Sequence, residues 1–246
     1  IKNIKVKNEK VKMIKKKNVV ILSSLTEKVK LSLNMYNKLY KMVDNYLMKD
    51  DLDLGDIPID TESFKNVKIF IVSLRYLKVI GNYNNQLSLT YKEFALLKKE
   101  GYNCELFASP FNVKSDNYCS AFYDIDKYFG SIGSFSNMKV IDGKYEVNPP
   151  YSEKIMESTM KKIDESLKYG NKEFSIYIPV WDAKTRKELG RKVDYESEYK
   201  TLTILENSEF FKSKNVLEKE NYKFYNDISN KYIHATDTYE IILSNL

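Results

Sequence analysis

The sequence predicts an α/β protein with a mostly parallel sheet, which is preceded by an N-terminal helical extension and ends in an antiparallel addition at the carboxyl end. Three observations predict this class. After about residue 100, short strand-like runs alternate with helical patterns, which is typical of a doubly wound sheet. Before residue 86 the apolar period is helical, and strand patterns close the sequence. We therefore expect an N-terminal helical region over residues 1–85 and a sheet domain over residues 86–246.

Two long helices are expected in the first region. Residues 25–48 place apolar side chains on one stripe of a 3.6-residue period, namely Leu31, Met35, Leu39, Val43 and Leu47. An acidic loop over residues 50–60 separates this helix from a second one over residues 64–80. The second helix is expected to end at the loop 81–85.

The sheet domain is expected to open with a third helix, which begins after Thr90 and runs to about Glu100. Glu93 stands three residues after Thr90, and this is the spacing of a capping box. A strand over residues 102–107 should follow, and a mixed segment of helix and loop should cover residues 116–133.

The rest of the domain alternates between strand and helix patterns. Residues 144–147 alternate polar and apolar side chains, and residues 174–179 are mostly apolar, as strands are. Residues 153–169 between them have an amphipathic helical period. Residues 201–205 and 239–243 complete the strand candidates. This order favours parallel strands joined by helices, followed by the antiparallel addition.

The charge balance fits a polyanionic partner without requiring one. Lys and Arg number 40 against 34 Asp and Glu, which gives a formal charge of +6 and a pI near 8.9. The lysine excess is densest between Lys2 and Lys17. That stretch is either a disordered basic arm or a phosphate contact, and the sequence leaves both open.

Cysteine and histidine usage excludes several kinds of site. Cys104 and Cys119 cannot form a disulfide framework or a zinc cluster, and His234 is the only histidine, so we expect no metal. We also expect no membrane partner, because no apolar run approaches spanning length and no signal peptide is evident. Two cysteines without a disulfide pattern favour a reducing, intracellular compartment, and the nucleus, the cytoplasm and a viral factory all stay open.

One tetrapeptide, Asn148-Pro149-Pro150-Tyr151, points to specific chemistry. The exocyclic amine of adenine is a poor nucleophile, because its lone pair is delocalised into the ring. The Asn148 side-chain carbonyl and the Pro149 backbone carbonyl can accept hydrogen bonds from this amine while the Tyr151 ring stacks on the base. The prolines fix the backbone torsions. The loop therefore predicts a methyltransferase that acts on adenine N6 with a sulfonium methyl donor, and the alternative interpretation is an ordinary turn.

The predicted strand that ends at Phe107 has no glycine-rich fingerprint after it. It is followed instead by Ala108-Ser109-Pro110-Phe111-Asn112. Small residues at the carboxyl end of a strand let a ligand approach the backbone, and Asn112 could bind the polar end of a cofactor. The alternative for this stretch is an ordinary strand exit.

Five short blocks occur in a fixed order between residues 107 and 181. They are Phe107-Ala108-Ser109-Pro110, Tyr118-Cys119-Ser120-Ala121-Phe122, Tyr128-Phe129-Gly130-Ser131, Asn148-Pro149-Pro150-Tyr151 and Ile178-Pro179-Val180-Trp181. Together they resemble the catalytic domain of the phosphorylated-CTD-interacting-factor family, from about Leu74 to the carboxyl end. That family holds the cap-specific adenosine methyltransferases, which methylate N6 of the 2′-O-methyladenosine next to the 7-methylguanosine cap of messenger RNA.

The resemblance implies a fold, a cofactor and partners. The fold would be a Rossmann-like class I methyltransferase sheet, the cofactor S-adenosylmethionine, and the partner capped RNA. Other proteins of the capping pathway would be further partners, and DNA is less favoured. The catalytic loop would be Asn148, Pro149, Pro150 and Tyr151. The cofactor would contact Ala108, Ser109, Pro110, Asn112, Phe129, Gly130, Asn148 and Tyr151.

RNA contacts follow partly from the resemblance and partly from charge. The family contacts its capped RNA at the positions of Glu153 and Trp181. Glu153 equally suits the first turn of a helix, and Trp181 equally suits a core, so both alternatives stay open. Candidates for holding RNA phosphates are Arg75, Lys184, Arg186 and Arg191, with solvated surface charge as the alternative.

The sequence departs from its characterised relatives in four places. Trp181 is the only tryptophan, so the two-tryptophan pattern of a WW domain is absent. Tyr151 replaces a Phe, which is conservative for stacking, whereas Val180 and Ile132 replace charged residues beside the expected pocket. Two other functions therefore stay open: a DNA adenine methyltransferase with the same loop, and a non-catalytic binding subunit with the same fold.

Overall fold

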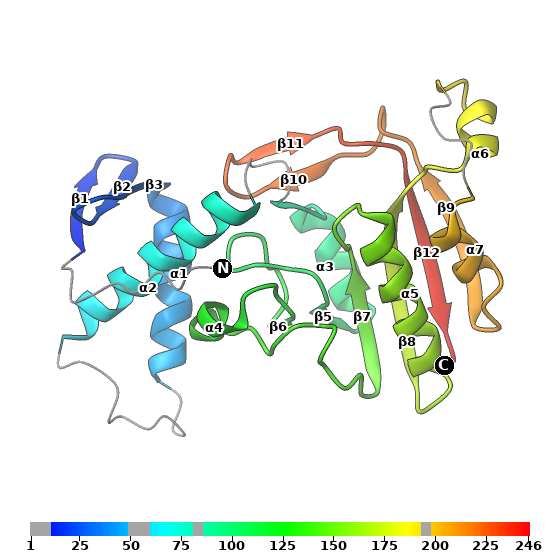
Figure 1. The fold of residues 1–246 in the computed structure, drawn as a ribbon, viewed down its shortest axis with the longest axis horizontal. Coiled ribbons are helices and arrows are strands. Elements are labelled where there is room, and N and C mark those ends of the chain that lie inside the picture. The colour runs from blue at the N-terminus through cyan, green and yellow to red at the C-terminus, as the bar shows by residue number, and fades with distance from the viewer. Residues whose placement is uncertain (1–10, 49–59, 81–85, 193–197) are drawn as a thin grey trace.

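The computed structural model describes residues 11–48, 60–80, 86–192 and 198–246, and Figure 1 shows their arrangement. They form a mixed α/β fold with a mostly parallel central sheet, as predicted. Most of the expected loops 50–60 and 81–85 lie outside the described residues. None of the described helices is long and apolar enough to cross a bilayer.

Six strands build the central sheet in the order β6-β5-β7-β8-β12-β9. Their bounds are β5 (Tyr102–Glu105), β6 (Asn117–Tyr118), β7 (Gly143–Val147), β8 (Lys172–Pro179), β9 (Phe211–Leu217) and β12 (Thr238–Ser244). The first four are parallel to one another, and β12 is antiparallel to both β8 and β9. Nearly all of β8 is buried, as expected for a central strand covered on both faces.

The order in which the chain adds strands to the sheet reverses between β5 and β7. From β5 the chain continues to β6, which pairs with one edge of β5. It then crosses back to β7, which pairs with the other edge of β5. Loops that leave the carboxyl ends of these two neighbouring strands therefore diverge. This point in an open parallel sheet is where ligands bind.

Helix α5 (Glu153–Leu167) provides the main apolar layer over the sheet, and it lies across β7 and β8 in Figure 1. Its side chains Met156, Met160, Ile163 and Leu167 recur at helical spacing and are fully buried. Burial of each such side chain stabilises the fold by about 1.5–3 kcal/mol. They join the inward-facing residues of β7, β8 and β12 in one core, and α7 (Lys200–Glu206) packs against α5 from outside.

The opposite face of the sheet is covered by a small antiparallel sheet and α3 (Tyr91–Lys99). The small sheet has the order β11-β10-β4, with β4 (Leu87–Ser88), β10 (Phe224–Asn226) and β11 (Lys231–Ile233). The predicted capping box begins α3: Glu93 N donates to Thr90 Oγ1 at 3.3 Å, and Thr90 N donates to Glu93 Oε2 at 2.9 Å.

The N-terminal part packs two helices against a three-stranded antiparallel sheet. The strands are β1 (Lys12–Lys16), β2 (Val19–Ser23) and β3 (Lys28–Ser32), and the helices are α1 (Leu33–Leu47) and α2 (Thr61–Arg75), with a π-helical turn η2 (Tyr76–Ile80). Their shared core also takes in Phe111, Ile125 and Phe129 from the next part of the chain. Short elements complete the fold: α4 (Tyr123–Asp126), η4 (Lys127–Phe129) and α6 (Ala183–Glu188).

Two sequence predictions are wrong in detail. The helix expected over residues 25–48 begins only at Leu33, because residues 28–32 alternate exposed and buried side chains as a strand and Ser32 caps the helix at Met35 N. The strand expected over residues 201–205 is helix α7, because Leu202 and Leu205 pack against α5 at helical spacing.

Other elements match or extend the expectations. The strand expected over residues 239–243 is confirmed as β12. Strands β1, β2, β4, β6, β9, β10 and β11 were not predicted. Residues 12–32 thus add a sheet to the region expected to be helical, and the domain division near residue 86 stays a prediction.

Candidate active site

A cavity of about 990 Å³ lies at the carboxyl ends of β5 and β7, where the strand order reverses. This volume is at the upper end of the range for small-molecule sites, about 300–1,000 Å³. Four segments supply most of its wall: the loop after β5, the loop after β7, residues 134–136, and one side of α5. The cavity is closed by η2 and by the small sheet with the residue before it, which supply Tyr76, Gln86, Leu87 and Phe224.

The loop after β7 brings the predicted catalytic residues Asn148, Pro149, Pro150 and Tyr151 to this cavity. The Asn148 side-chain amide donates through Nδ2 to the backbone oxygen of Leu87 at 3.5 Å. This bond leaves the Asn148 oxygen as the free acceptor of that amide. Ser152 N donates to the Pro150 oxygen at 2.7 Å, and α5 begins at the next residue.

The loop after β5 is held by its own hydrogen bonds in place of a glycine-rich turn. The Ser109 backbone N–H and hydroxyl both donate to Asn112 Oδ1, at 2.8 and 3.0 Å, and the hydroxyl is also 2.5 Å from Gln86 Oε1. Ala108, Ser109 and Asn112 all line the cavity. Side chains that were predicted to contact a cofactor are therefore brought together with the loop of Asn148.

Four ionisable side chains, buried or partly buried, hold this loop in place through hydrogen bonds and an ion pair. Glu105 accepts hydrogen bonds from the backbone N–H groups of Lys114 and Ser115, at 2.6 and 2.7 Å. Lys114 forms a buried ion pair with Asp227 at 3.0 Å, so the loop is tied to the segment after β10. Lys38 of α1 donates to the backbone oxygens of residues 111 and 113, at 2.8 and 3.0 Å, and burial lowers the pKa of Lys38 to about 8.

Two buried carboxyl groups lie side by side beneath the site. Glu105 and Glu146 are direct neighbours in the β5–β7 pairing, so their side chains share one face of the sheet. Burial raises the pKa of Glu105, and hydrogen bonds from Lys114 and Ser115 oppose this rise. Burial, followed by the proximity of Glu105, raises the pKa of Glu146 well above its ordinary value. Glu146, two residues before Asn148, therefore favours its neutral form.

Residues 134–136 and α5 form a wall that the sequence did not reveal. Ser134, Phe135, Ser136, Ile155, Ser158, Thr159 and Lys162 line the cavity from these segments. Lys162 Nζ donates to three backbone oxygens, those of Phe135 at 2.5 Å, Ser136 at 2.9 Å and Met138 at 2.8 Å. Burial lowers the pKa of Lys162. The helical spacing of Ile155, Thr159 and Lys162 was readable, but nothing in the sequence indicates which loop they face.

An aromatic cluster stands behind the Asn148 loop. The Tyr151 and Trp181 rings meet edge to face, with centroids 6.4 Å apart, and Trp181 lies 5.8 Å from Tyr199. Tyr199 is fixed by donating its hydroxyl to the Pro179 oxygen at 2.9 Å. Tyr151 lines the cavity, whereas Trp181 packs against the apolar core and is not part of the cavity wall.

Three residues predicted to contact the cofactor do not line the cavity. Pro110 is buried within the loop after β5. Phe129 is 1% exposed and packs in the N-terminal core, where its backbone oxygen accepts a hydrogen bond from Tyr118 at 3.0 Å. Gly130 ends the η4 turn with φ +91°, a conformation that favours glycine. These residues shape the neighbouring segment and do not face the cavity.

The charged residues predicted to contact RNA also lie outside the cavity wall. Glu153 accepts a hydrogen bond from Thr201 N in the first turn of α7 at 2.9 Å. The other four have partners within the chain. Arg75 pairs with Asp124 at 3.1 Å, Lys184 with Glu188 at 4.0 Å and Arg191 with Asp237 at 3.2 Å, and Arg186 donates to the backbone oxygen of Val180 at 3.3 Å.

Comparison with known proteins gives consistent results. A family model described as phosphorylated CTD interacting factor 1 WW domain matches residues 38–227. The chain is 31% identical over 179 residues to the mRNA (2'-O-methyladenosine-N(6)-)-methyltransferase of Homo sapiens and 29% identical over 179 residues to that of Mus musculus. Each alignment covers 70% of this chain and 24% of the relative. The chain thus spans about a quarter of the length of the curated relatives that it matches.

Proposed function

The chain belongs to the phosphorylated CTD interacting factor 1 family, and we propose that it methylates N6 of the adenosine next to the cap of messenger RNA. The methyl donor in this proposal is S-adenosylmethionine. The names of the human and mouse relatives support the reaction, and they are the basis for choosing RNA over DNA. One structural observation carries the proposal. The Asn148 loop and the loop after β5 open into one cavity at the point where the strand order of the sheet reverses.

The residues present fit S-adenosylmethionine, which supplies an electrophilic methyl group on a sulfonium. The cavity combines buried polar groups at Ser109 and Asn112 with an edge-to-face aromatic pair, Phe107 and Phe135, whose centroids are 5.6 Å apart. A nucleoside with a charged amino-acid end requires both kinds of surface. We assign the contacts to Ala108, Ser109 and Asn112, and we assign Phe129, Gly130 and Pro110 an indirect role. The Rossmann-like class I fold is part of the same proposal, supported by the parallel order of β6, β5, β7 and β8.

In the proposed reaction the chain orients the adenine amine. The Asn148 oxygen accepts a hydrogen bond from this amine, because the Nδ2 group of the same amide is bound to Leu87. The Pro149 backbone oxygen provides a second acceptor, and the Tyr151 ring stacks on the base. Trp181 and Tyr199 hold the Tyr151 ring in place from behind. After methyl transfer the amine loses its extra proton to water, so no residue is needed as a strong base.

Glu153 and Trp181 remain the proposed contacts to the capped end of the RNA. Glu153 uses Oε1 to hold α7, whereas its Oε2 is buried without a hydrogen-bond partner among the described residues. A buried carboxylate oxygen in this state is costly unless a donor reaches it. An amino or imino group of a base would supply that donor, and this supports the assignment.

The direct test is methyl transfer from labelled S-adenosylmethionine to matched RNAs with and without a 7-methylguanosine cap. The RNAs begin with A or G, and a DNA oligonucleotide serves as a further substrate. We expect transfer only to capped RNA that begins with A. Transfer to DNA or to internal adenines would support the proposed methyl transfer but reject capped RNA as the substrate. Binding of the cofactor without transfer to any substrate would indicate a non-catalytic binding subunit.

Substitution of Asn148 tests the assigned mechanism. Asn148→Ala should lower turnover by at least about 100-fold, since removal of one preorganised hydrogen-bonding group from an active site typically has this effect. The matched control is Asn221→Ala, which removes an exposed amide that does not line the cavity and should leave turnover unchanged. Normal turnover in a folded Asn148→Ala variant would overturn the mechanism.

A further inference from the structure

The N-terminal sheet has one buried face and one open face. Val20, Leu22, Val29 and Leu31 fill the core beneath it. The strand pairing places the alternate residues together on the outer face. These nine positions are Lys12, Ile14 and Lys16 on β1, Val19, Ile21 and Ser23 on β2, and Lys28, Lys30 and Ser32 on β3. The face carries four lysines and no acidic residue.

The four lysines flank an uncharged central strip. Lys12 and Lys16 lie on one outer strand, Lys28 and Lys30 lie on the other, and β2 between them carries only aliphatic and serine side chains. Neighbouring strands are about 4.8 Å apart, so the two lysine rows are separated by about 10 Å. An extended polyanion that lies along β2 would therefore have ammonium groups on both sides.

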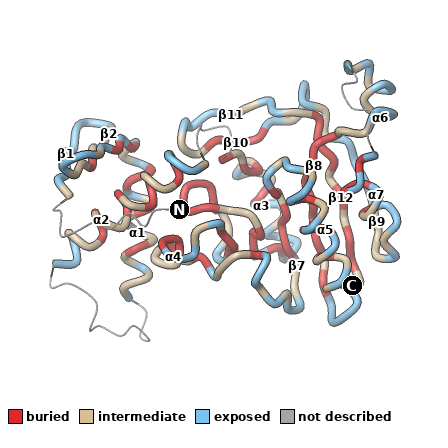
Figure 2. Tube along the Cα trace, viewed as in Figure 1, coloured by how far each residue is buried: buried red, intermediate tan, exposed pale blue. Residues whose placement is uncertain are grey.

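These charges are not neutralised within the described part of the chain. All four lysines are exposed, none takes part in an ion pair there, and Figure 2 shows β1 in the exposed colour. The nearby Glu27 is bound to Lys78 instead. Four ammonium groups on one face repel one another unless anions lie between them, and this makes the face a site for an anionic partner.

Strand β3 lies near the active-site cavity. Lys30 and Leu31 line a second, small cavity of about 20 Å³ together with Tyr76 and Gln86. Tyr76 and Gln86 also line the large cavity, so they separate the Asn148 site from β3. Arg75 and Arg191, two of the arginines predicted to bind phosphates, are paired with acidic residues of the chain. RNA that leaves the cavity toward Gln86 would pass close to β3, which carries Lys28 and Lys30.

We propose that the outer face of the β1–β3 sheet binds the sugar–phosphate backbone of RNA downstream of the methylated nucleotide. This inference rests on the proposed function, because it extends the path of the same substrate. The face has no aromatic side chain on which bases could stack, so recognition is by phosphate charge and is independent of sequence. Its contribution appears only with RNAs long enough to cross from the cavity to the sheet.

The test compares two variants of equal net charge. One replaces the face lysines by Gln (Lys12→Gln, Lys16→Gln, Lys28→Gln and Lys30→Gln), and the control replaces four exposed lysines on other elements (Lys92→Gln, Lys99→Gln, Lys212→Gln and Lys223→Gln). Fluorescence anisotropy gives the Kd for a capped 3-nucleotide RNA and a capped 20-nucleotide RNA at several salt concentrations. Thermal melting checks that both variants fold.

We expect the face variant to lose affinity for the 20-nucleotide RNA only. If all four lysines contact phosphates, the slope of log K against log salt should fall by about 2.8, at about 0.7 per contact on a single strand. The control variant should bind both RNAs like the unsubstituted chain. Equal losses in the two variants, or an equal loss on the 3-nucleotide RNA, would show that the face is not a specific RNA path.

Two further measurements separate this inference from the proposed function. Anisotropy needs no turnover, so length-dependent binding through the face lysines is measurable even if methyl transfer fails. Conversely, methylation of the 3-nucleotide RNA with no length effect would keep the proposed function and reject the lysine face. Loss of binding to an acidic peptide in place of RNA would identify a protein-docking surface and would also reject the inference.

Discussion

Replacement of Lys162 by Met should weaken cofactor binding while leaving the protein folded. Lys162 Nζ donates to the backbone oxygens of Phe135, Ser136 and Met138, so one ammonium group fixes the whole loop that forms a wall of the cavity. Met retains the apolar length of the side chain and removes only the donor. The loop would then lose its anchor while the core contacts of α5 remain.

The magnitude follows from the three hydrogen bonds. A hydrogen bond to a charged group contributes a net stability of about 1.5–3 kcal/mol. The bond to Ser136 is exposed, so water replaces part of what is lost. We therefore expect the loop to lose about 2 kcal/mol, less than the sum of three buried bonds, and this free energy corresponds to about a 30-fold rise in the Kd of the cofactor.

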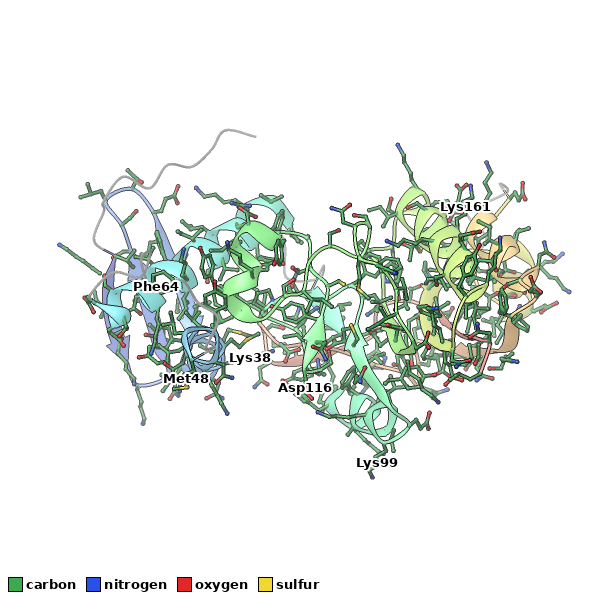
Figure 3. All side chains as sticks on the ribbon, turned by 90° about the horizontal axis from the view of Figure 1, so that it is seen from below. Lys38, Met48, Phe64, Lys99, Asp116 and Lys161 are labelled. Carbon is green, nitrogen blue, oxygen red and sulfur yellow. The ribbon has the colours of Figure 1, made fainter. Side chains whose placement is uncertain are left out.

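The neighbouring Lys161 provides the control. Its side chain is 63% exposed, it pairs with Glu157 on the same helix at 2.6 Å, and it lies at the outer edge of the molecule in Figure 3. Such a surface pair contributes only about 0.3–0.5 kcal/mol, so Lys161→Met should bind cofactor normally. Calorimetric titration with S-adenosylmethionine gives both Kd values, and circular dichroism melting gives the stability. An unchanged Kd for Lys162→Met, or an equal rise for both variants, would refute the anchoring argument.

Three further predictions concern stability. Thr90→Ala removes the capping box with Glu93 and should lower the free energy of unfolding by about 1 kcal/mol in urea titration, and no change would show that α3 does not need the cap. Burial raises the pKa of Asp126 to about 6, so the folded protein holds the extra proton between about pH 4 and 6 and stability falls as pH rises through that window. Asp126→Asn should flatten this part of the melting-temperature profile, and an unaltered pH profile would contradict the assignment. Gly170→Ala places a Cβ 2.1 Å from Asp142 Oδ1 at φ +72°, so the melting temperature should drop, and a variant as stable as the parent would contradict the geometry.

The sequence was sufficient for those elements in which local pattern and tertiary role agree. Helix α5 and strand β8 were predicted because an amphipathic period and a buried apolar run each fit only one structure at that length. Residues 201–205 misled because Thr201, Thr203 and Ile204 are β-branched and favour strands. Their actual state is set by the packing of Leu202 and Leu205 on α5, which no local pattern reports.

The candidate site likewise contains residues that the sequence could predict and residues that it could not. The loops of Ser109 and Asn148 were predictable, since the carboxyl ends of adjacent parallel strands meet at one edge of a sheet. Gln86 and Lys162 were not, because each reaches the cavity through contacts with a distant part of the chain. Phe129 and Gly130 were expected at the cavity from the resemblance, but the structure places them against the N-terminal core and the η4 turn.

The position of β12 between β8 and β9 has a consequence for synthesis of the protein. Strand β8 is almost wholly buried in the finished sheet, yet the edge that β12 covers stays unpaired until residue 244 has been made. At 5–20 residues per second this exposes an apolar edge for about 3–13 s, a period in which strands of other chains compete for it. Ala235, three residues before β12, also lines the cavity. A nascent chain that stalls before this segment is therefore exposed to aggregation and lacks part of the cavity wall.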